Sequence, residues 1–166
     1  GLVVPHVDSV DKAREVARNG RFGHGGRGFA GSTRWAGYAT RGMSDVLAQA
    51  KSETVIIAQI EEPEAVDAAH DIAAVDGIDG LFVGPADLSV GYGFDHQNSP
   101  QLEAALEKVG AACKANGKTY VTWVTNAEKA ADWARYGLTM FFIASEHTWM
   151  RAGATAQARG IHELDL

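Results

Sequence analysis

The feature of this sequence that most restricts its fold is an alternation of short apolar runs with longer amphipathic segments. The apolar runs predict strands near residues 2–6, 54–60, 79–84, 118–124 and 140–144. Strands that alternate with helices indicate a parallel sheet, because a parallel pair needs a crossover connection. The strands are apolar at nearly every position, so we expect both faces of the sheet to be buried.

Between these strands, apolar residues recur at helical spacing and the usual start and stop residues flank them. Asp8 and Asn126 are predicted N-caps, and Pro63 stands at a first helical position. The predicted helices cover residues 8–20, 44–51, 63–73, 99–117, 126–137 and 149–158.

The length of the chain limits how these units can close. A closed eight-stranded β/α barrel takes about 250 residues. Five β/α units in 166 residues therefore fit a barrel that lacks its first three units, and a small doubly wound sheet is the alternative. No composition shift marks an internal boundary, so residues 1–166 are predicted to form a single domain.

Composition excludes several classes of protein. The chain carries 15 Lys and Arg against 21 Asp and Glu, a net charge of −6, which argues against a nucleic-acid surface. No apolar run approaches the roughly 20 residues that span a bilayer, so we expect no membrane protein. The single cysteine, Cys113, excludes a disulfide framework and a cysteine-built zinc site. The first residues do not resemble a signal peptide, which favours a cytoplasmic protein. The chain also lacks an initiator Met, which hints that Gly1 is not the natural start.

A glycine-rich segment contains two apparent nucleotide-binding motifs. Gly23–Gly28 matches G-x-G-x-x-G, but that motif needs a preceding strand, and here a helix precedes it. Gly26–Thr33 resembles a phosphate loop, but Ser32 stands where the lysine is required. We interpret both as chance matches in a segment that is either a mobile loop near a site or a plain connection.

Two carboxylates follow successive buried strands. Glu61 and Asp87 stand at the carboxyl ends of their strands, the edge where α/β proteins bind ligands. Paired carboxylates without a nearby Lys or Arg repel unless a cation or a proton lies between them. Oxygen ligands of this kind suit Mg²⁺ or Mn²⁺. The alternative is that both residues are helix-capping acids.

Three neighbouring residues extend this pattern. Gly84 allows a sharp turn after the strand, which frees the N–H groups of Ala86 and Asp87 for an anion such as a carboxylate. The Gln59 amide is suited to bind a substrate or a metal-bound water. A simple tight turn and a buried glutamine that bonds only to backbone are the alternatives.

Four segments carry a resemblance to a known family. They are Val4–Val7 (VPHV), the loop Gly28–Ser32, Gln59–Glu61 (QIE) and the long motif Asp76–Ser89 (DGIDGLFVGPADLS). On these segments the sequence resembles the HpcH/HpaI aldolase/citrate lyase family, the metal-dependent class II pyruvate aldolases of the phosphoenolpyruvate/pyruvate barrel superfamily. The similarity extends over nearly the whole chain.

The resemblance implies a fold, an activity and a site. The chain is expected to be the C-terminal five β/α units of a TIM (β/α)₈ barrel. The activity is that of a carbon–carbon lyase, which cleaves 4-hydroxy-2-oxo acids to pyruvate and an aldehyde through a metal-stabilised enolate. Substrates of this type include 2-keto-3-deoxy sugar acids and hydroxy-oxo-heptanedioates. By the resemblance Glu61 and Asp87 bind a divalent metal ion, namely Mg²⁺, Mn²⁺ or Co²⁺. The N–H groups of Ala86 and Asp87, which follow Gly84, bind the pyruvate carboxylate, and Gln59 contacts the substrate.

Two other functions stay open. One is a citrate-lyase-like enzyme that acts on acyl-CoA, although the chain shows no basic patch for a CoA phosphate. The other is a non-catalytic fragment or binding module that keeps the metal site but lacks the catalytic base. Related enzymes are homo-oligomers, so we expect an oligomer in which the last helix is a candidate for exchange between subunits.

The sequence departs from the family pattern at several positions. The family's general base, a histidine, and its substrate arginine are expected upstream of Gly1, so neither has a counterpart here. His6 lies near the site and is interpreted as a wall residue, with a replacement base as the alternative. Trp123 falls near the position that lines the aldehyde pocket, with core packing as the alternative, and Glu146 and His147 are expected to be solvated.

Overall fold

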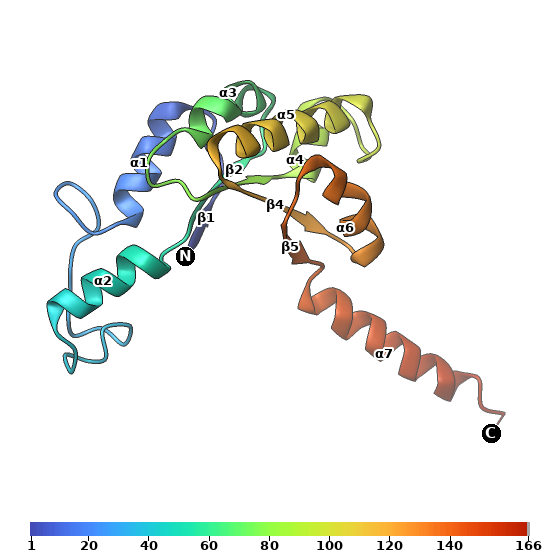
Figure 1. Cartoon of the computed structure of the whole chain (residues 1–166). Helices are drawn as coiled ribbons and strands as arrows, with labels where there is room; N and C mark the ends of the chain where they lie inside the picture. Colours follow the sequence, from blue (N-terminus) through green and yellow to red (C-terminus); the bar gives the residue numbers. More distant parts are fainter. Residues whose placement is uncertain (166) are drawn as a thin grey trace.

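The computed structural model describes residues 1–165 and is built on one parallel sheet of five strands in the order β1-β2-β3-β4-β5 (Figure 1). Every neighbouring pair is parallel. The strands are β1 (Leu2–Val4), β2 (Ile56–Ile60), β3 (Gly80–Val83), β4 (Thr119–Val124) and β5 (Met140–Ile143). Each lies within its predicted range. A doubly wound sheet reverses its strand order, and this sheet does not, so the structure supports the partial barrel and not the alternative.

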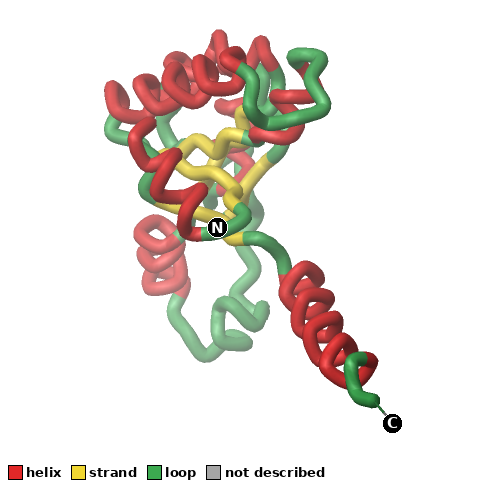
Figure 2. The backbone as a smooth tube through the Cα atoms, turned by 90° about the vertical axis from the view of Figure 1, so that its right-hand side faces the viewer, coloured by secondary structure: helices red, strands yellow, loops and turns green. Residues whose placement is uncertain are grey.

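The helices lie mainly over one side of this sheet, where Figure 1 shows α1, α3 and α5 side by side. The helices are α1 (Val10–Gly20), α2 (Met43–Glu53), α3 (Pro63–Ala73), α4 (Pro85–Gly91), α5 (Pro100–Asn116), α6 (Ala127–Trp133) and α7 (Glu146–His162), with a short 3₁₀ helix at Ala134–Tyr136. The sheet curls, so the helix-covered side is called the convex face and the opposite side the concave face (Figure 2).

The helix predictions need three corrections. Ser9 and not Asp8 caps α1, because the Ser9 hydroxyl accepts from the backbone N–H of Lys12. The last helix extends beyond both predicted ends. The short helix α4 was not predicted, because its opening Gly84–Pro85 is typical of a turn.

The main core fills the space between the convex face and the helices. Ile56, Ala58 and Ile60 of β2 point into it, and Tyr120 of β4 donates its hydroxyl to the backbone carbonyl of Leu106 at 2.8 Å. On the concave face the described residues form one small buried hydrophobic cluster, Ile57, Phe82 and Val121. The expectation that both faces are buried is therefore confirmed for the convex face and only partly met on the concave one.

Two parts of the chain extend away from this core. Figures 1 and 2 show α7 projecting past β5, and none of its side chains is buried. The helix α2 lies at the other end of the molecule, beyond the segment that contains the glycine-rich motifs. That segment follows α1 and is not entered by a strand, in agreement with the chance-match interpretation. Across residues 1–165 we find no helix with the length and apolar character needed to cross a membrane.

Candidate active site at the carboxyl edge of the sheet

The centre of the candidate site is Glu61, the first residue after β2. Its side chain is only 5% exposed, although it carries a carboxylate. The Gln59 side-chain amide donates to Glu61 Oε2, and the backbone N–H of His6 donates to Glu61 Oε1 at 2.8 Å. Gln59 and Glu61 are two residues apart, so both face the concave side. These two bonds fix the carboxylate at the edge of the sheet.

Gly84 lies directly beside Glu61 on the neighbouring strand. Its backbone N–H donates to the carbonyl of Ile60 at 2.9 Å. A Cβ at position 84 would lie 2.9 Å from Glu61 Cβ and 3.4 Å from Glu61 Oε2, so only glycine leaves room for the carboxylate. The place of a side chain at position 84 is thus taken by the side chains of Glu61 and Gln59.

Asp87 reaches the same edge from the first turn of α4. This helix begins at Pro85, and the first N–H groups of an α-helix have no acceptor within the helix. The N–H groups of Ala86 and Asp87 therefore have no acceptor within the helix. Both residues are exposed, whereas Glu61 is buried. The topology thus places Glu61, Gly84, Ala86 and Asp87 at one edge of the sheet.

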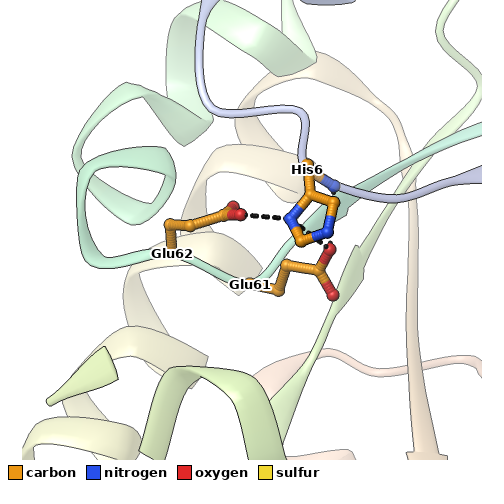
Figure 3. A group of neighbouring side chains, drawn as sticks. All are labelled: His6, Glu61 and Glu62. Atoms are coloured by element: carbon orange, nitrogen blue, oxygen red, sulfur yellow. Dashed lines mark hydrogen bonds and ion pairs between the residues drawn. The ribbon is translucent and has the colours of Figure 1, made fainter. Parts of the chain in front are cut away.

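A histidine joins this edge from β1 (Figure 3). His6 Nδ1 lies 2.5 Å from Glu62 Oε1 and 3.2 Å from Glu61 Oε1. The hydrogen bond to Glu62, and then the charge of Glu61, raise the pKa of the His6 imidazole above its ordinary value. The ring is largely exposed, so His6 is hydrogen-bonded at the mouth of the site and not packed into its wall.

His6, Glu61 and Glu62 offer ligand atoms that all lie within 4.8 Å of one another. Glu62 did not emerge from the sequence as a site residue, and its Oε2 is buried without a hydrogen-bond partner. Sequence reasoning missed the contact because His6 meets Glu61 and Glu62 only through the parallel pairing of β1 with β2.

The electrostatics of this edge favour a cation. Glu61 and Glu62 each offer a carboxylate oxygen within 4.8 Å of the other and of a His6 ring nitrogen, and within residues 1–165 their ion pairs involve only His6. Asp87 lies at the same edge of the sheet but is not a member of this group. Clustered carboxylates of this kind repel one another unless a positive charge lies among them. Carboxylate oxygens are the ligands that Mg²⁺ and Mn²⁺ prefer, so the residues present fit such an ion.

Trp123 lies on the concave face of β4, further along the same edge. On the same strand Tyr120 and Val124 point into the convex core. Side chains alternate along a strand, so Trp123 points to the concave face, where it is 37% exposed. Its indole N–H donates to the backbone carbonyl of Ala144 at 2.9 Å. Glu146 and His147 open α7 and are exposed, in line with the expected solvation.

Comparison with known proteins decides the family. Residues 1–152 match the family model described as HpcH/HpaI aldolase/citrate lyase. The chain belongs to this family. A hydroxypyruvate/pyruvate aldolase of Delftia acidovorans is 34% identical over 161 residues, which is 93% of this chain and 58% of that protein. A 4-hydroxy-2-oxo-heptane-1,7-dioate aldolase of Escherichia coli is 30% identical over 158 residues, which is 95% of this chain and 60% of that protein.

Solved structures of the HpcH/HpaI family share the fold. A member from Burkholderia cenocepacia superposes with a TM-score of 0.87 at 28% identity, over 98% of this chain and 65% of that one. The HpcH/HpaI aldolase of Desulfitobacterium hafniense superposes with a TM-score of 0.86 at 26% identity, over 98% of this chain and 63% of that one. The family and the partial-barrel fold expected from the sequence are confirmed. The chain spans about three fifths of the curated relatives' length, with 58% and 60% covered.

Proposed function

We propose that the protein is a lyase that cleaves a 4-hydroxy-2-oxo acid to pyruvate and an aldehyde, and that it catalyses the reverse addition. The observation that carries this proposal is the buried Glu61 carboxylate at the carboxyl edge, with Gly84 and the first turn of α4 beside it. The names of the aldolase relatives at 30–34% identity support the same reaction class.

The proposed cofactor is a divalent metal ion bound by Glu61 and Asp87. Such an ion, Mg²⁺, Mn²⁺ or Co²⁺, would act as a Lewis acid on the oxygen atoms of a 2-oxo acid. Gln59 holds one carboxylate oxygen of Glu61 and the His6 N–H holds the other, so Glu61 needs little rearrangement on binding.

The N–H groups of Ala86 and Asp87 are proposed to hold the substrate carboxylate. They point out of the first turn of α4, where the helix supplies no acceptor. Gly84 precedes them, and its lack of a side chain lets Glu61 lie directly beside this turn. This arrangement orients the substrate with its carboxylate toward α4 and its reacting carbons above the concave face.

The reaction balances as a retro-aldol cleavage. The 4-hydroxyl proton leaves to a base while the bond between C3 and C4 breaks, which gives the aldehyde. C3 then takes up a proton and becomes the methyl group of pyruvate. The base and the substrate arginine are proposed to come from the barrel units that precede Gly1 in the complete protein, which would also complete the single domain.

Activity after loss of Glu61 or Asp87 tests this function. In the protein with its complete barrel, we expect pyruvate release from 4-hydroxy-2-oxo acids to fall at least 100-fold in Glu61→Gln and in Asp87→Ala. Loss of a residue that only hydrogen-bonds to a metal ligand already lowers metal affinity or activity about 10–100-fold, and loss of a ligand is expected to cost more. A chelator is expected to abolish the activity of the wild type, and added Mn²⁺ to restore it. Asp76→Asn, at the opposite end of the sheet, is the control. Activity that survives both substitutions would contradict the proposal.

A further inference from the structure

The amino edge of the sheet carries a groove that the proposed function does not use. The groove has a volume of about 1090 Å³, the size of a site for an organic small molecule. It is lined by α1, by the end of α3 with residues 74–79, and by Lys118. Because β3 begins at Gly80 and β4 at Thr119, the groove lies at the opposite end of the strands from Glu61. We call it the amino-edge groove.

The amino-edge groove gathers positive charge, although the net charge of the chain is −6. Five Lys and Arg line it, against three Asp. The five basic residues are Arg14, Arg18, Arg21, Lys51 and Lys118. Arg14 and Arg18 are four residues apart on α1 and share one face of it, whereas Lys51 and Lys118 join them only through the fold. The sequence showed no basic patch for a phosphate group, and the structure assembles one.

Three of these cations have no acid as a partner. Within residues 1–165 neither Arg18 nor Lys51 forms an ion pair, and both are exposed. Lys118 donates to the backbone carbonyl of Ile78 at 2.6 Å, which leaves its charge without a counterion. Positive charge that the protein does not neutralise attracts an anion to the groove.

The walls of the groove are held in place by the surrounding backbone. Arg21 donates to the carbonyl of Gly77 at 3.2 Å and to Asp79 at 2.6 Å, and Asp79 accepts from the N–H of Ile56 at 2.7 Å. The glycine-rich segment closes tightly on the end of α1, because a Cβ at Gly26 would lie 2.7 Å from the carbonyl oxygen of Arg21. The site is therefore formed before any ligand enters.

The rest of the lining is largely apolar. It includes Val10, Ala17, Phe22, Val75 and Ile78. Phe22 is half-buried and also lines an adjoining cavity of about 380 Å³, together with Arg21 and Lys51. The guanidinium carbon of Arg27 lies 4.4 Å from the centre of the Phe22 ring. A ligand that fills this space has an apolar or aromatic portion as well as its negative charge.

We propose that the amino-edge groove binds a ligand that carries a nucleoside 5′-diphosphate, either as a free nucleotide or as part of a coenzyme. Its phosphate oxygens accept hydrogen bonds from Arg18, Lys51 and Lys118, and its base lies along Phe22. The strands that separate the groove from the carboxyl edge are four to six residues long, about 13–20 Å. The ligand is therefore not the substrate bound at Glu61, and the proposal is independent of the proposed function.

Equilibrium dialysis of ADP and of coenzyme A against the protein with its complete barrel tests this site. EDTA is present throughout, so that no metal ion at the carboxyl edge recruits the phosphates. We expect saturable binding of both, and we expect pyrophosphate to compete at least tenfold more weakly than ADP, because it has no portion that contacts Phe22. Tighter binding of coenzyme A assigns the diphosphate to a coenzyme, and tighter binding of ADP assigns it to a free nucleotide.

Two substitutions test the proposed phosphate contacts. Arg18→Gln and Lys51→Gln remove charges that form no ion pair within residues 1–165, so urea unfolding is expected to show an intact fold. Each is expected to weaken ADP binding about tenfold, the loss of one hydrogen bond to a charged group. Arg151→Gln, exposed on α7, is the matched control and is expected to leave the affinity unchanged.

The outcomes also separate this proposal from the proposed function. Absence of ADP and coenzyme A binding, or equal affinity of the wild type, Arg18→Gln and Lys51→Gln, would overturn the groove as a phosphate site. Equal affinity for ADP and pyrophosphate would overturn the role of Phe22. Glu61→Gln is expected to bind ADP as the wild type does while it loses pyruvate release. Loss of ADP binding in Glu61→Gln would place the ligand at the carboxyl edge and contradict this proposal alone.

Discussion

Glu61 is the residue on which the proposed site depends, and its neighbours restrict it tightly. The Gln59 amide and the His6 N–H each hold one carboxylate oxygen. On the β3 side Glu61 packs against Gly84, which has no side chain. The buried carboxylate is therefore held in one position at the edge of the sheet.

Gly84→Ala is predicted to disturb this arrangement by contact alone. The φ of Gly84 is −94°, which any residue adopts, but the new Cβ would lie 2.9 Å from Glu61 Cβ. We expect the free energy of unfolding to fall by about 1–3 kcal/mol, the usual cost of overpacking, together with a loss of Mn²⁺ affinity. Urea unfolding and Mn²⁺ titration measure the two effects. Gly28→Ala, where a Cβ meets open space, is the control, and equal behaviour of the two variants would refute the steric role.

Cys113 is predicted to be chemically inert in the folded protein. Burial raises the pKa of the Cys113 thiol from 9.0 to about 12, and only the thiolate reacts. At pH 8 we expect a chromogenic disulfide reagent to react about 1,000-fold more slowly than with the denatured chain, one factor of ten per pKa unit. Between pH 9 and 12 the unfolded chain loses this proton first, so the free energy of unfolding falls as the pH rises. Rapid reaction without denaturant would contradict this assignment.

Part of the site could be predicted from the residues alone and part could not. Glu61 and Asp87 stand out because each follows a buried strand, and Gly84 because a turn must follow β3. The contact of His6 with Glu61 and Glu62 has no local signal, since it depends on a left-handed turn at His6 (φ 57°) and on pairing across 55 residues. Trp123 was predicted as a pocket residue, but only the strand register shows that it lies level with Glu61 across β2, β3 and β4.

Single caps determine where the helices begin. Ser9→Ala removes the hydroxyl that accepts from the Lys12 N–H, and we expect it to lower the free energy of unfolding by about 1 kcal/mol. Asp8→Ala removes an ion pair with Lys12 at the protein surface and is expected to cost less, because solvent screens such a pair. Urea unfolding of both variants distinguishes them. A larger loss in Asp8→Ala would show that the cap is Asp8 after all.

The predicted elements were accurate where burial produces a clear pattern. The strands were located because their convex side chains pack against the helices, and α5 ends as expected at Gly117, whose φ is 63°. The helix α4 was missed because it has only seven residues and opens with Gly84–Pro85. The length of α7 was underestimated because none of its side chains is buried, so no apolar stripe marks its extent.

At the scale of the whole molecule, the sheet curls around a concave face that carries the proposed site at its carboxyl edge (Figure 2). The edge strands β1 and β5 have open hydrogen-bonding sides in the described chain, and the relatives are longer by a length that would hold further β/α units. A site on an open sheet is less well preorganised than one in a closed barrel. The complete protein is therefore expected to bind metal more tightly than the 166-residue chain.

The most direct test of the account is a titration of Mn²⁺ in the protein with its complete barrel. Glu61→Gln and Asp87→Asn keep the shape of each side chain and remove its charge, so each is expected to weaken Mn²⁺ binding at least tenfold while urea unfolding shows an intact fold. Glu107→Gln, an exposed glutamate on α5 away from the site, is the matched control and is expected to leave Mn²⁺ affinity unchanged. Equal affinity of the wild type, Glu61→Gln and Asp87→Asn would contradict the account, and loss in Glu62→Gln with none in Asp87→Asn would move the ion to the His6 side of the edge.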